Sequence, residues 1–362
     1  MNLEECRKEI DRIDNEILDL LKVRGNIAKE VAENKKKEGK TNLHDPAREK
    51  LILDRLKEKN QSNYSPEHIE SIFKEIFSAS LALQKPLSVA FLGPIGTFSH
   101  QAVIKELGSG VNMIPCQTIE DVFLSVEKEE ADYGMVPVEN SLRGSVLVTL
   151  DELMNTTLTI VSERSIKISH MLLSSETDLK KIHTVYSHEQ PLAQCHNWLK
   201  SNLPNAEIKP VSSTASAAEM VVSKQGEAAI GPENLALNNS LNIIARHIED
   251  HPNNYTRFFL MGKTPLRKID KCKTSVLVTI EDRLGALHDL LHSFADEGIN
   301  LTKIESRPLK SNTWQYCFFI DFLCHREEES VKRAIATIEK EGARCKVLGS
   351  YVTNNSEKNG GK

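Results

Sequence analysis

Residues 3 to 37 contain no proline and a single glycine, Gly25. Steps of four and three residues from Leu3 meet ten positions in this stretch, of which six are apolar. This is the heptad spacing of a helix that packs against other helices. At about 1.5 Å per residue such a helix is roughly 50 Å long. An N-terminal domain of 84 residues is too small to cover it alone, so we expect a partner chain.

Charged residues occupy the other four positions of this seam: Arg7, Asp14, Arg24 and Lys35. A charge on a packing seam is costly unless it is paired. One interpretation is that these side chains set the register of the helix or reach solvent. The other is that three cations on one seam form a site for an anion.

Two further helices have distinct start signals. Asp45 precedes Pro46, and Ser65 precedes Pro66, so each pair has an N-cap residue followed by proline at the first helical position. The third helix carries Ser80 and Gln84 at the edge of its apolar face. These two polar residues are expected to lie one turn apart.

Taken together, these polar positions resemble those of the all-helical chorismate mutase family over residues 1–84. The resemblance implies an interlocked dimer of three-helix chains, in which the partner's Arg7 enters each site. It also implies that cationic side chains hold the substrate carboxylates and that Lys35 and Gln84 face its ether oxygen. Because chorismate rearranges to prephenate in one pericyclic step, the site needs charge stabilisation and no nucleophile. The residues that carry the resemblance are Arg7, Arg24, Lys35, Asp45, Arg48, Glu49, Ser80 and Gln84.

Short Val/Ile/Leu runs alternate with helical stretches over residues 88–263, which is typical of an α/β fold. Polar clusters follow several of these runs, where such folds place ligands. Each cluster by itself could be turn chemistry. Ser187 and His188 with a carboxylate could suggest a hydrolase triad, but the chain has no G-x-S-x-G elbow there. The clusters are GPIGTFSHQA, VPVENS, YSHEQPLAQC, AAIGPENLA and NYTRF.

Together these clusters resemble prephenate dehydratase. The resemblance implies two α/β lobes, like those of a periplasmic binding protein, with the substrate between them. It assigns catalysis to Thr256 with a network of Asn140, Ser187 and Gln194, since a threonine hydroxyl is too weak an acid to act alone. Arg257 has two interpretations, a contact with a substrate carboxylate or a structural ion pair. The expected substrate-binding residues are Thr97, Glu139, Ser141, Arg257 and Phe258.

Residues 274–352 read as strand, helix, two strands, helix and strand, the ferredoxin-like order, after a polar linker at 263–273. They resemble an ACT regulatory domain of the phenylalanine-sensing kind, which implies an effector bound between two such domains. The tail, 353–362, is expected to be disordered. The expected effector-binding residues are Gly285, Ala286, Leu287, His288, Asn300, Leu301, Glu305, Ser306, Arg307 and Pro308.

Composition excludes several other functions. The net charge of −5 gives no electrostatic basis for binding nucleic acid, and no apolar run has the length of a membrane helix. The N-terminus lacks the apolar core of a signal peptide, and the seven cysteines show no metal-binding spacing. We therefore expect a cytoplasmic protein with reduced thiols, without metal or other cofactor, and without nucleic-acid or membrane partners.

The sequence thus predicts a multidomain chain: an all-α three-helix domain, a two-lobed α/β domain and an α+β ferredoxin-like domain. Its predicted function is conversion of chorismate to prephenate and then to phenylpyruvate, with feedback inhibition by L-phenylalanine, in a homodimer or higher homo-oligomer. One alternative is a prephenate dehydratase whose helical segment only dimerises. The other is an amino-acid sensor without catalytic activity.

Overall fold

The computed structural model describes residues 1–39, 44–268, 272–281, 283–308 and 316–353. The chain forms two compact units. The first contains residues 1–88 with the short segment 107–112, and the second contains the remainder. The expected tail lies almost entirely outside the described residues.

Three helices build the first unit: α1 (Leu3–Lys37), α2 (Pro46–Lys59) and α3 (Pro66–Ala82). The predicted start signals are confirmed, because Asp45 accepts a hydrogen bond from the Arg48 backbone and Ser65 accepts one from the His68 backbone. Gln84 differs from the expectation. Helix α3 ends at Ala82, so Gln84 lies in the turn that follows, where its backbone N–H donates to Leu81.

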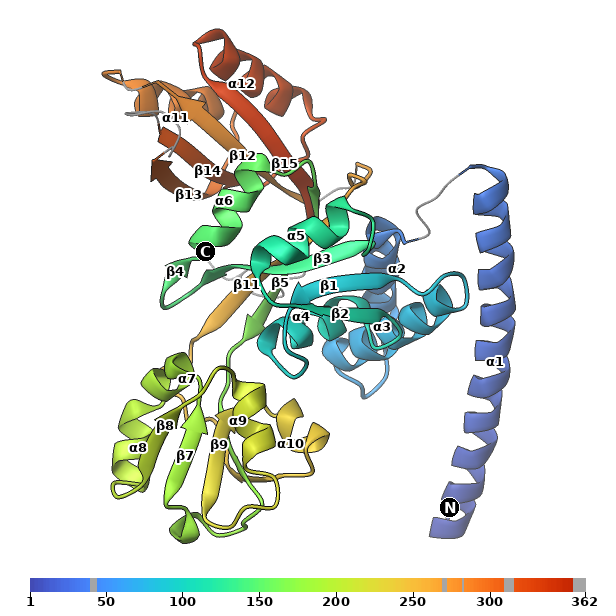
Figure 1. The fold of residues 1–362 in the computed structure, drawn as a ribbon. Helices are drawn as coiled ribbons and strands as arrows, with labels where there is room; N and C mark the ends of the chain where they lie inside the picture. The colour runs from blue at the N-terminus through green and yellow to red at the C-terminus, as the bar shows by residue number, and fades with distance from the viewer. Residues whose placement is uncertain (40–43, 269–271, 282, 309–315, 354–362) are drawn as a thin grey trace. The chain divides into compact units, whose positions relative to one another are not determined.

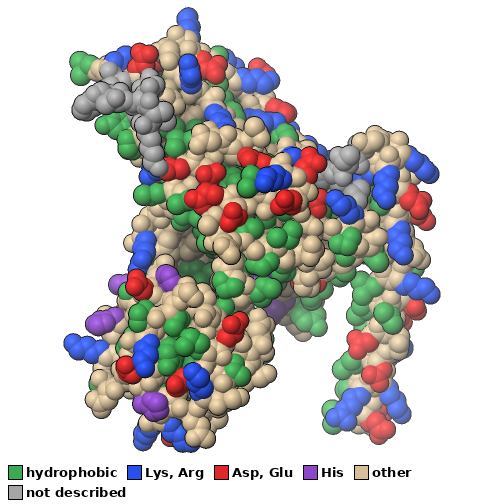
Figure 2. Space-filling model, viewed as in Figure 1, with side chains coloured by type: hydrophobic (Ala, Val, Ile, Leu, Met, Phe, Trp, Pro, Cys, Tyr) green, Lys and Arg blue, Asp and Glu red, His purple; other side chains and the backbone are tan. Residues whose placement is uncertain are grey.

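Helix α1 exposes most of its apolar seam (Figure 2). Only its second half, around Arg24, Gly25, Ala28 and Ala32, is partly or fully buried within the unit. Five of the six apolar seam positions remain exposed, and an exposed apolar stripe of this kind is typical of a surface that packs against another protein surface. These positions are Leu3, Ile10, Ile17, Leu21 and Val31.

The second unit begins with a first α/β lobe. In its sheet β3 pairs with β1 in parallel and with β11 antiparallel, and β11 pairs in turn with β5. The strands are β1 (Ser88–Leu92), β2 (Asn112–Cys116), β3 (Tyr133–Asn140), β4 (Gly144–Ser145), β5 (Thr159–Lys167) and β11 (Tyr255–Gly262). The helices are α4 (Phe98–Leu107), α5 (Ile119–Glu127) and α6 (Leu147–Asn155).

A second α/β lobe is inserted between β5 and β11 (Figure 1). Its five-stranded sheet has the order β10-β6-β9-β7-β8. The chain enters it through residues 168–170 and leaves it through 246–254, which we call the crossover segments. The two-lobed arrangement expected from the sequence is therefore confirmed. Its strands are β6 (Met171–Ser174), β7 (Thr184–Ser187), β8 (Glu207–Pro210), β9 (Glu227–Gly231) and β10 (Asn242–Ala245). Its helices are η1 (Leu179–Lys181), α7 (Glu189–Gln194), α8 (His196–Asn202), α9 (Thr214–Met220) and α10 (Asn234–Asn238).

The C-terminal module has the predicted βαββαβ order. It contains β12 (Cys272–Ile280), α11 (Ala286–Asp296), β13 (Leu301–Pro308), β14 (Tyr316–Phe322), α12 (Glu329–Lys340) and β15 (Arg344–Thr353). Helices α11 and α12 cover one face of its sheet (Figure 1).

The polar segment 263–273 predicted a C-terminal module attached only through a linker. The structure differs from that expectation. Strand β15 pairs with β5, so the module's sheet and that of the first lobe form one ten-stranded sheet. The face of the module that its own helices leave open packs on first-lobe residues, with Tyr351 against Phe259. Because both faces of the module's sheet are buried, the module and the first lobe share a hydrophobic core.

Gly349 is required where β15 approaches β5. A Cβ atom at this position would collide with the backbone oxygen of Ile160 and lie 2.9 Å from the nitrogen of the same residue. Backbone atoms on a paired strand cannot move aside as a flexible side chain can.

We predict that Gly349→Ala lowers the stability of the second unit by about 1–3 kcal/mol, the usual cost of overpacking. Thermal unfolding of the full chain measures this. Gly25→Ala is the matched control, because its Cβ would meet only the end of the Leu83 side chain, at 3.3 Å, and alanine favours a helix. Equal melting temperatures for wild type and Gly349→Ala would contradict the close approach.

Candidate functional sites

The pairing of β11 with β3 brings Thr256 beside Asn140. The Asn140 side-chain amide donates a hydrogen bond to Thr256 Oγ1 over 3.0 Å and another to Asn254 Oδ1 over 2.7 Å. Its carbonyl oxygen accepts from the backbone N–H groups of Leu142 and Arg143. Asn140 is thus held on both sides and has one orientation.

This arrangement decides how the Thr256 hydroxyl can act. Because its oxygen accepts from Asn140, its own proton remains available for another acceptor. The neighbouring Asn254 side chain is almost fully buried, and its Nδ2 has no hydrogen-bond partner among the described residues. Asn254 was not among the predicted site residues, although it lies in the NYTRF motif that pointed to Thr256.

The other predicted residues of this region are distributed over the two lobes. Gln194 ends α7 in the second lobe, where its Oε1 lies 2.7 Å from His170 Nε2. The Ser187 hydroxyl is fully buried and donates to the Ile230 carbonyl over 2.7 Å, so its proton is already used. Within the described residues no hydrogen bond joins either side chain to Thr256.

Three predicted substrate-binding residues have structural contacts in this chain. Thr97 donates to the Pro94 carbonyl over 3.0 Å in the turn before α4. Ser141 accepts from the Tyr255 backbone over 2.9 Å, next to Thr256. Phe258 is buried at 2% exposure and belongs to the core of the sheet.

Arg257 forms ion pairs within the protein, as the second of its two interpretations expects. It binds the buried carboxylate of Glu163 and lies 2.7 Å from Asp321 of the C-terminal module. It also donates to Tyr351 Oη over 2.9 Å. Burial acts to lower the pKa of Arg257, but Tyr351, Asp321 and Glu163 outweigh that effect and raise the pKa. The guanidinium is therefore charged and is bound by these three protein groups.

Glu139 also has a protein partner. Its carboxylate lies 2.7 Å from the amino group of Lys303, on β13 of the C-terminal module. The residue next to Asn140 is therefore linked directly to that module.

The first unit brings together part of the predicted mutase site. Arg24 donates to the Ser80 hydroxyl, and its guanidinium lies over the Phe77 ring, 5.4 Å from the centroid. Burial lowers the pKa of Arg24, and the charge of Glu49 opposes that shift. Gln84 Oε1 is buried without a hydrogen-bond partner in the described structure. Buried polar atoms without a partner are rare, so this oxygen calls for an ordered water or a ligand.

The remaining mutase residues are less closely gathered. Arg7 is exposed in the half of α1 that its own unit does not cover, and Lys35 is partly buried near the end of the same helix. Asp45 caps α2 by accepting a hydrogen bond from the Arg48 backbone. This role explains its presence in the sequence pattern without any contact with a substrate. Glu49 lies 3.5 Å from the buried imidazole of His44.

The predicted effector residues divide between two sides of β13. Glu305 binds Ser145, and Arg307 binds Asp151, so both face the first lobe. Ser306 and Pro308 alternate with them and are exposed. Strand β13 is also the last strand of the ten-stranded sheet, and its outer edge pairs with no other strand among the described residues.

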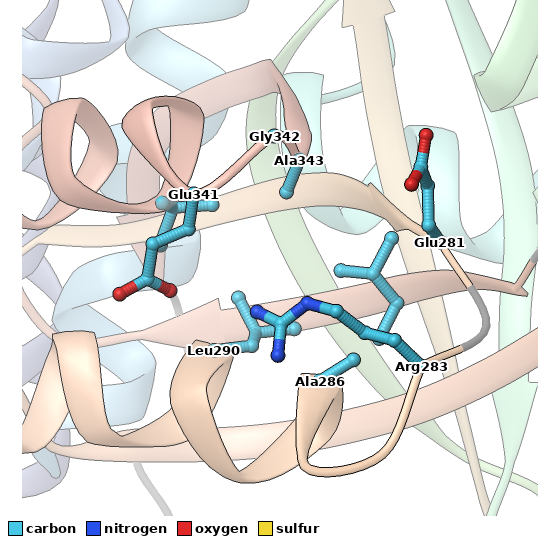
Figure 3. Close-up of a pocket in the computed structure, with 9 residues that line it drawn as sticks. Glu281, Arg283, Ala286, Leu290, Glu341, Gly342 and Ala343 are labelled. Atoms are coloured by element: carbon cyan, nitrogen blue, oxygen red, sulfur yellow. The ribbon is translucent and has the colours of Figure 1, made fainter.

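The other effector residues surround the start of α11. Gly285 adopts a left-handed conformation at the N-cap, with φ 82°, and Leu287 and His288 are exposed. Asn300 and Leu301 begin the next strand, where the Asn300 carbonyl accepts from Leu323. A pocket nearby contains Ala286 with Leu290 and Glu341, and Figure 3 shows Arg283 extending across it.

No group of three or more metal-ligating side chains occurs among the residues that the structure describes. Of the described helices, none combines the length and apolar character that crossing a membrane requires.

Comparison with known proteins assigns a family to each part of the chain. Residues 6–85 match the type II chorismate mutase family, 89–266 the prephenate dehydratase family, and 274–340 the ACT domain. A solved structure of prephenate dehydratase with L-Phe, from Arthrobacter aurescens, is similar with a TM-score of 0.66 and 35% identity. That similarity covers 73% of this chain and 89% of the other.

Relatives that match nearly the whole chain are described as bifunctional enzymes. The bifunctional chorismate mutase/prephenate dehydratase of Aquifex aeolicus is 43% identical over 353 residues, covering 96% of this chain and 97% of the relative. The enzyme with the same description from Stutzerimonas stutzeri is 40% identical with the same coverage. The chain belongs to the family of bifunctional chorismate mutase/prephenate dehydratases.

Proposed function

We propose that this chain converts chorismate to prephenate in its helical unit and prephenate to phenylpyruvate in its two-lobed region. The carrying observation is the hydrogen bond from Asn140 to Thr256, which presents a hydroxyl proton at the start of β11. Seven free cysteines support a reducing compartment, so we place the enzyme in the cytoplasm.

The dehydratase step needs a proton for the leaving hydroxyl. In prephenate the bond from the ring to the carboxylate carbon breaks, and its electron pair completes the aromatic ring as the hydroxyl leaves. The products are phenylpyruvate, CO2 and water once the leaving oxygen has gained a proton. Thr256 donates a hydrogen bond to this oxygen, and Asn140 holds the threonine oxygen in place, while solvent supplies the proton that makes the leaving group water. Hydrogen bonds aimed at charge that develops in the transition state are the main contribution such a site makes.

Replacing Thr256 by alanine is expected to lower dehydratase kcat by at least about 100-fold, the usual range for a lost transition-state donor. Mutase activity should stay near wild type, because the two sites lie in separate units. Phenylpyruvate formation and chorismate loss, measured on the same full-length sample, give both rates. Thr256→Ser, which keeps the hydroxyl, is the matched control. Equal loss of both activities in a folded protein would contradict separate sites.

We propose that the mutase site is completed in a homodimer. Arg24 and Ser80 meet within one chain, whereas Arg7 is exposed on the uncovered part of α1. A partner helix on the exposed seam would bury its leucines and isoleucines and bring its own Arg7 to the site. Arginine suits the carboxylates of chorismate because its planar fork donates two parallel hydrogen bonds.

Gln84→Glu is expected to restrict mutase activity to acidic pH. In the proposed site a neutral amide donates to the ether oxygen, and a carboxyl group can do so only while protonated. An unperturbed glutamate has a pKa of about 4.3, so activity should fall as pH rises above the pKa of the new carboxyl group. A pH profile of chorismate loss measures this, with Gln84→Ala as the control that loses activity at every pH. An unchanged profile would remove Gln84 from the ether oxygen.

We propose that L-phenylalanine inhibits the dehydratase through β13. One face of β13 is exposed, and β13 is the last strand of the described sheet. The effector and a second C-terminal module are expected to bind there. The other face of β13 reaches the first lobe through Lys303, which binds Glu139 beside the catalytic Asn140. An effector that shifts β13 therefore acts on Glu139, the residue that adjoins Asn140 in the proposed site.

Lys303→Met is expected to weaken inhibition by L-phenylalanine while leaving its binding intact. Methionine keeps the length of the side chain but removes the contact with Glu139. Allosteric coupling is commonly about 5–150-fold in affinity, and the variant should lose most of it. Phenylpyruvate formation against effector concentration gives inhibition, and calorimetry gives binding. Ser306→Ala is the control expected to weaken binding itself, and full inhibition of Lys303→Met would exclude this route.

Deleting the C-terminal module is a less informative test. Glu163 is fully buried between Arg257 and Lys273, so deletion would remove one of its two cations and expose the edge of β5. Loss of activity in the deletion variant would then report on folding of the first lobe.

Two incubations, one with chorismate and one with added prephenate, separate this proposal from its two rivals. Full-length protein with chorismate should produce prephenate and then phenylpyruvate. A dehydratase with a helical segment that only dimerises would consume added prephenate but not chorismate. An amino-acid sensor would consume neither, although it would bind L-phenylalanine.

A further inference from the structure

His170 occupies a position that touches both lobes. It lies in the first crossover segment, and its backbone carbonyl accepts a hydrogen bond from Ile248 in the second. Its ring meets Phe98, at the start of α4 in the first lobe, edge-on at a centroid distance of 5.6 Å. Its Nε2 reaches Gln194 in the second lobe over 2.7 Å. Only 1% of the residue is exposed.

The imidazole has one hydrogen-bond partner. Burial lowers the pKa of His170, although Gln194 and Glu249 oppose the shift, so the ring is neutral near pH 7. A neutral imidazole carries one N–H. With that proton on Nε2 it donates to Gln194 Oε1, while the buried Nδ1 has no partner among the described residues.

Gln194 is thereby left with an unused donor. Its Oε1 is held by His170, and its Nε2 is buried without an acceptor in the described structure. Buried amide donors without a partner are rare, and such a group calls for a ligand or an ordered water. An N–H group of this amide can donate to an oxygen atom of a bound substrate.

We propose that His170 is a positioning residue for the dehydratase step: it holds the Gln194 carboxamide by its oxygen, so that an N–H group of the amide is presented to an oxygen of prephenate. The inference rests on the proposed function, since it places Gln194 in the dehydratase site. His170 itself does not touch the substrate.

Because His170 contacts Phe98, its hold on the Gln194 amide depends on how the two lobes are positioned. The first lobe supplies the aromatic edge against which the imidazole is packed, and the second supplies the amide that the imidazole holds. The two crossover segments are also joined through Glu249, which accepts from the His170 backbone over 2.8 Å. The orientation of the amide is therefore coupled to the way in which the lobes meet.

The test compares two amide substitutions in the full-length chain. His170→Gln places an N–H near the position of Nε2, whereas His170→Asn places it near Nδ1 and out of reach of Gln194. We expect His170→Asn to lower dehydratase kcat/KM about tenfold, which corresponds to one neutral hydrogen bond. We expect His170→Gln to remain within about threefold of wild type. Mutase activity of the same samples reports on the amount of folded enzyme.

A double substitution shows whether His170 acts through Gln194. In a Gln194→Ala background, His170→Asn should cost less than about twofold, since residues that act as a unit are not additive. A full tenfold further loss in that background would overturn the proposal, and so would equal rates for His170→Asn and His170→Gln. If His170→Asn fails to fold, His170→Phe in both backgrounds replaces it, because it keeps the ring and removes the donor.

The outcomes also separate this inference from the proposed function. Wild-type dehydratase activity in Gln194→Ala would overturn the role of His170, while leaving the Thr256 variants to decide the function. Absence of dehydratase activity in the unmodified chain would instead overturn the proposed function itself.

Discussion

The buried guanidinium of Arg257 joins the catalytic sheet to the C-terminal module. It binds Glu163 on β5 and Asp321 on β14, while Lys273 on β12 provides a second cation for Glu163. Removing one member of such a network leaves an uncompensated buried charge, which is far more costly than an exposed ion pair is stabilising. The charges therefore require the two sheets to meet in one register. The pairing of β15 with β5 and the close approach of Gly349 follow the same constraint.

Strand β11 connects this network to the chemistry. Thr256 and Arg257 are neighbours, and successive side chains on a strand point to opposite faces. One face of the strand therefore carries the hydroxyl held by Asn140, and the other carries the cation that binds the C-terminal module. Beside it, Glu139 and Asn140 of β3 repeat the arrangement, with Lys303 binding the first and Thr256 the second. Two adjacent residue pairs thus link the C-terminal module to the hydroxyl group of Thr256.

The helical unit depends on a different kind of constraint. Its longest helix exposes five of six apolar seam positions, and a surface of that kind is stable only when another apolar surface covers it. Because Arg7 lies on the uncovered part of the helix, one association could bury the seam and complete the anion site. Stability and catalysis would then both require the second chain.

The sequence alone determined the three N-terminal helices, the βαββαβ order of the C-terminal module and the three families, and it singled out Thr256. These features depend on local patterns: heptad spacing, proline caps and short motifs. The sequence could not decide between the two interpretations of Arg257, and it did not single out Asn254 or His170. Their roles depend on hydrogen bonds between residues far apart in the chain, such as Asn140 with Asn254 and His170 with Gln194. The tertiary structure also divided the ESRP motif, turning Glu305 and Arg307 toward the first lobe and leaving Ser306 exposed. The period of a strand predicts that such residues alternate, but only packing against a neighbouring sheet decides which face meets which partner.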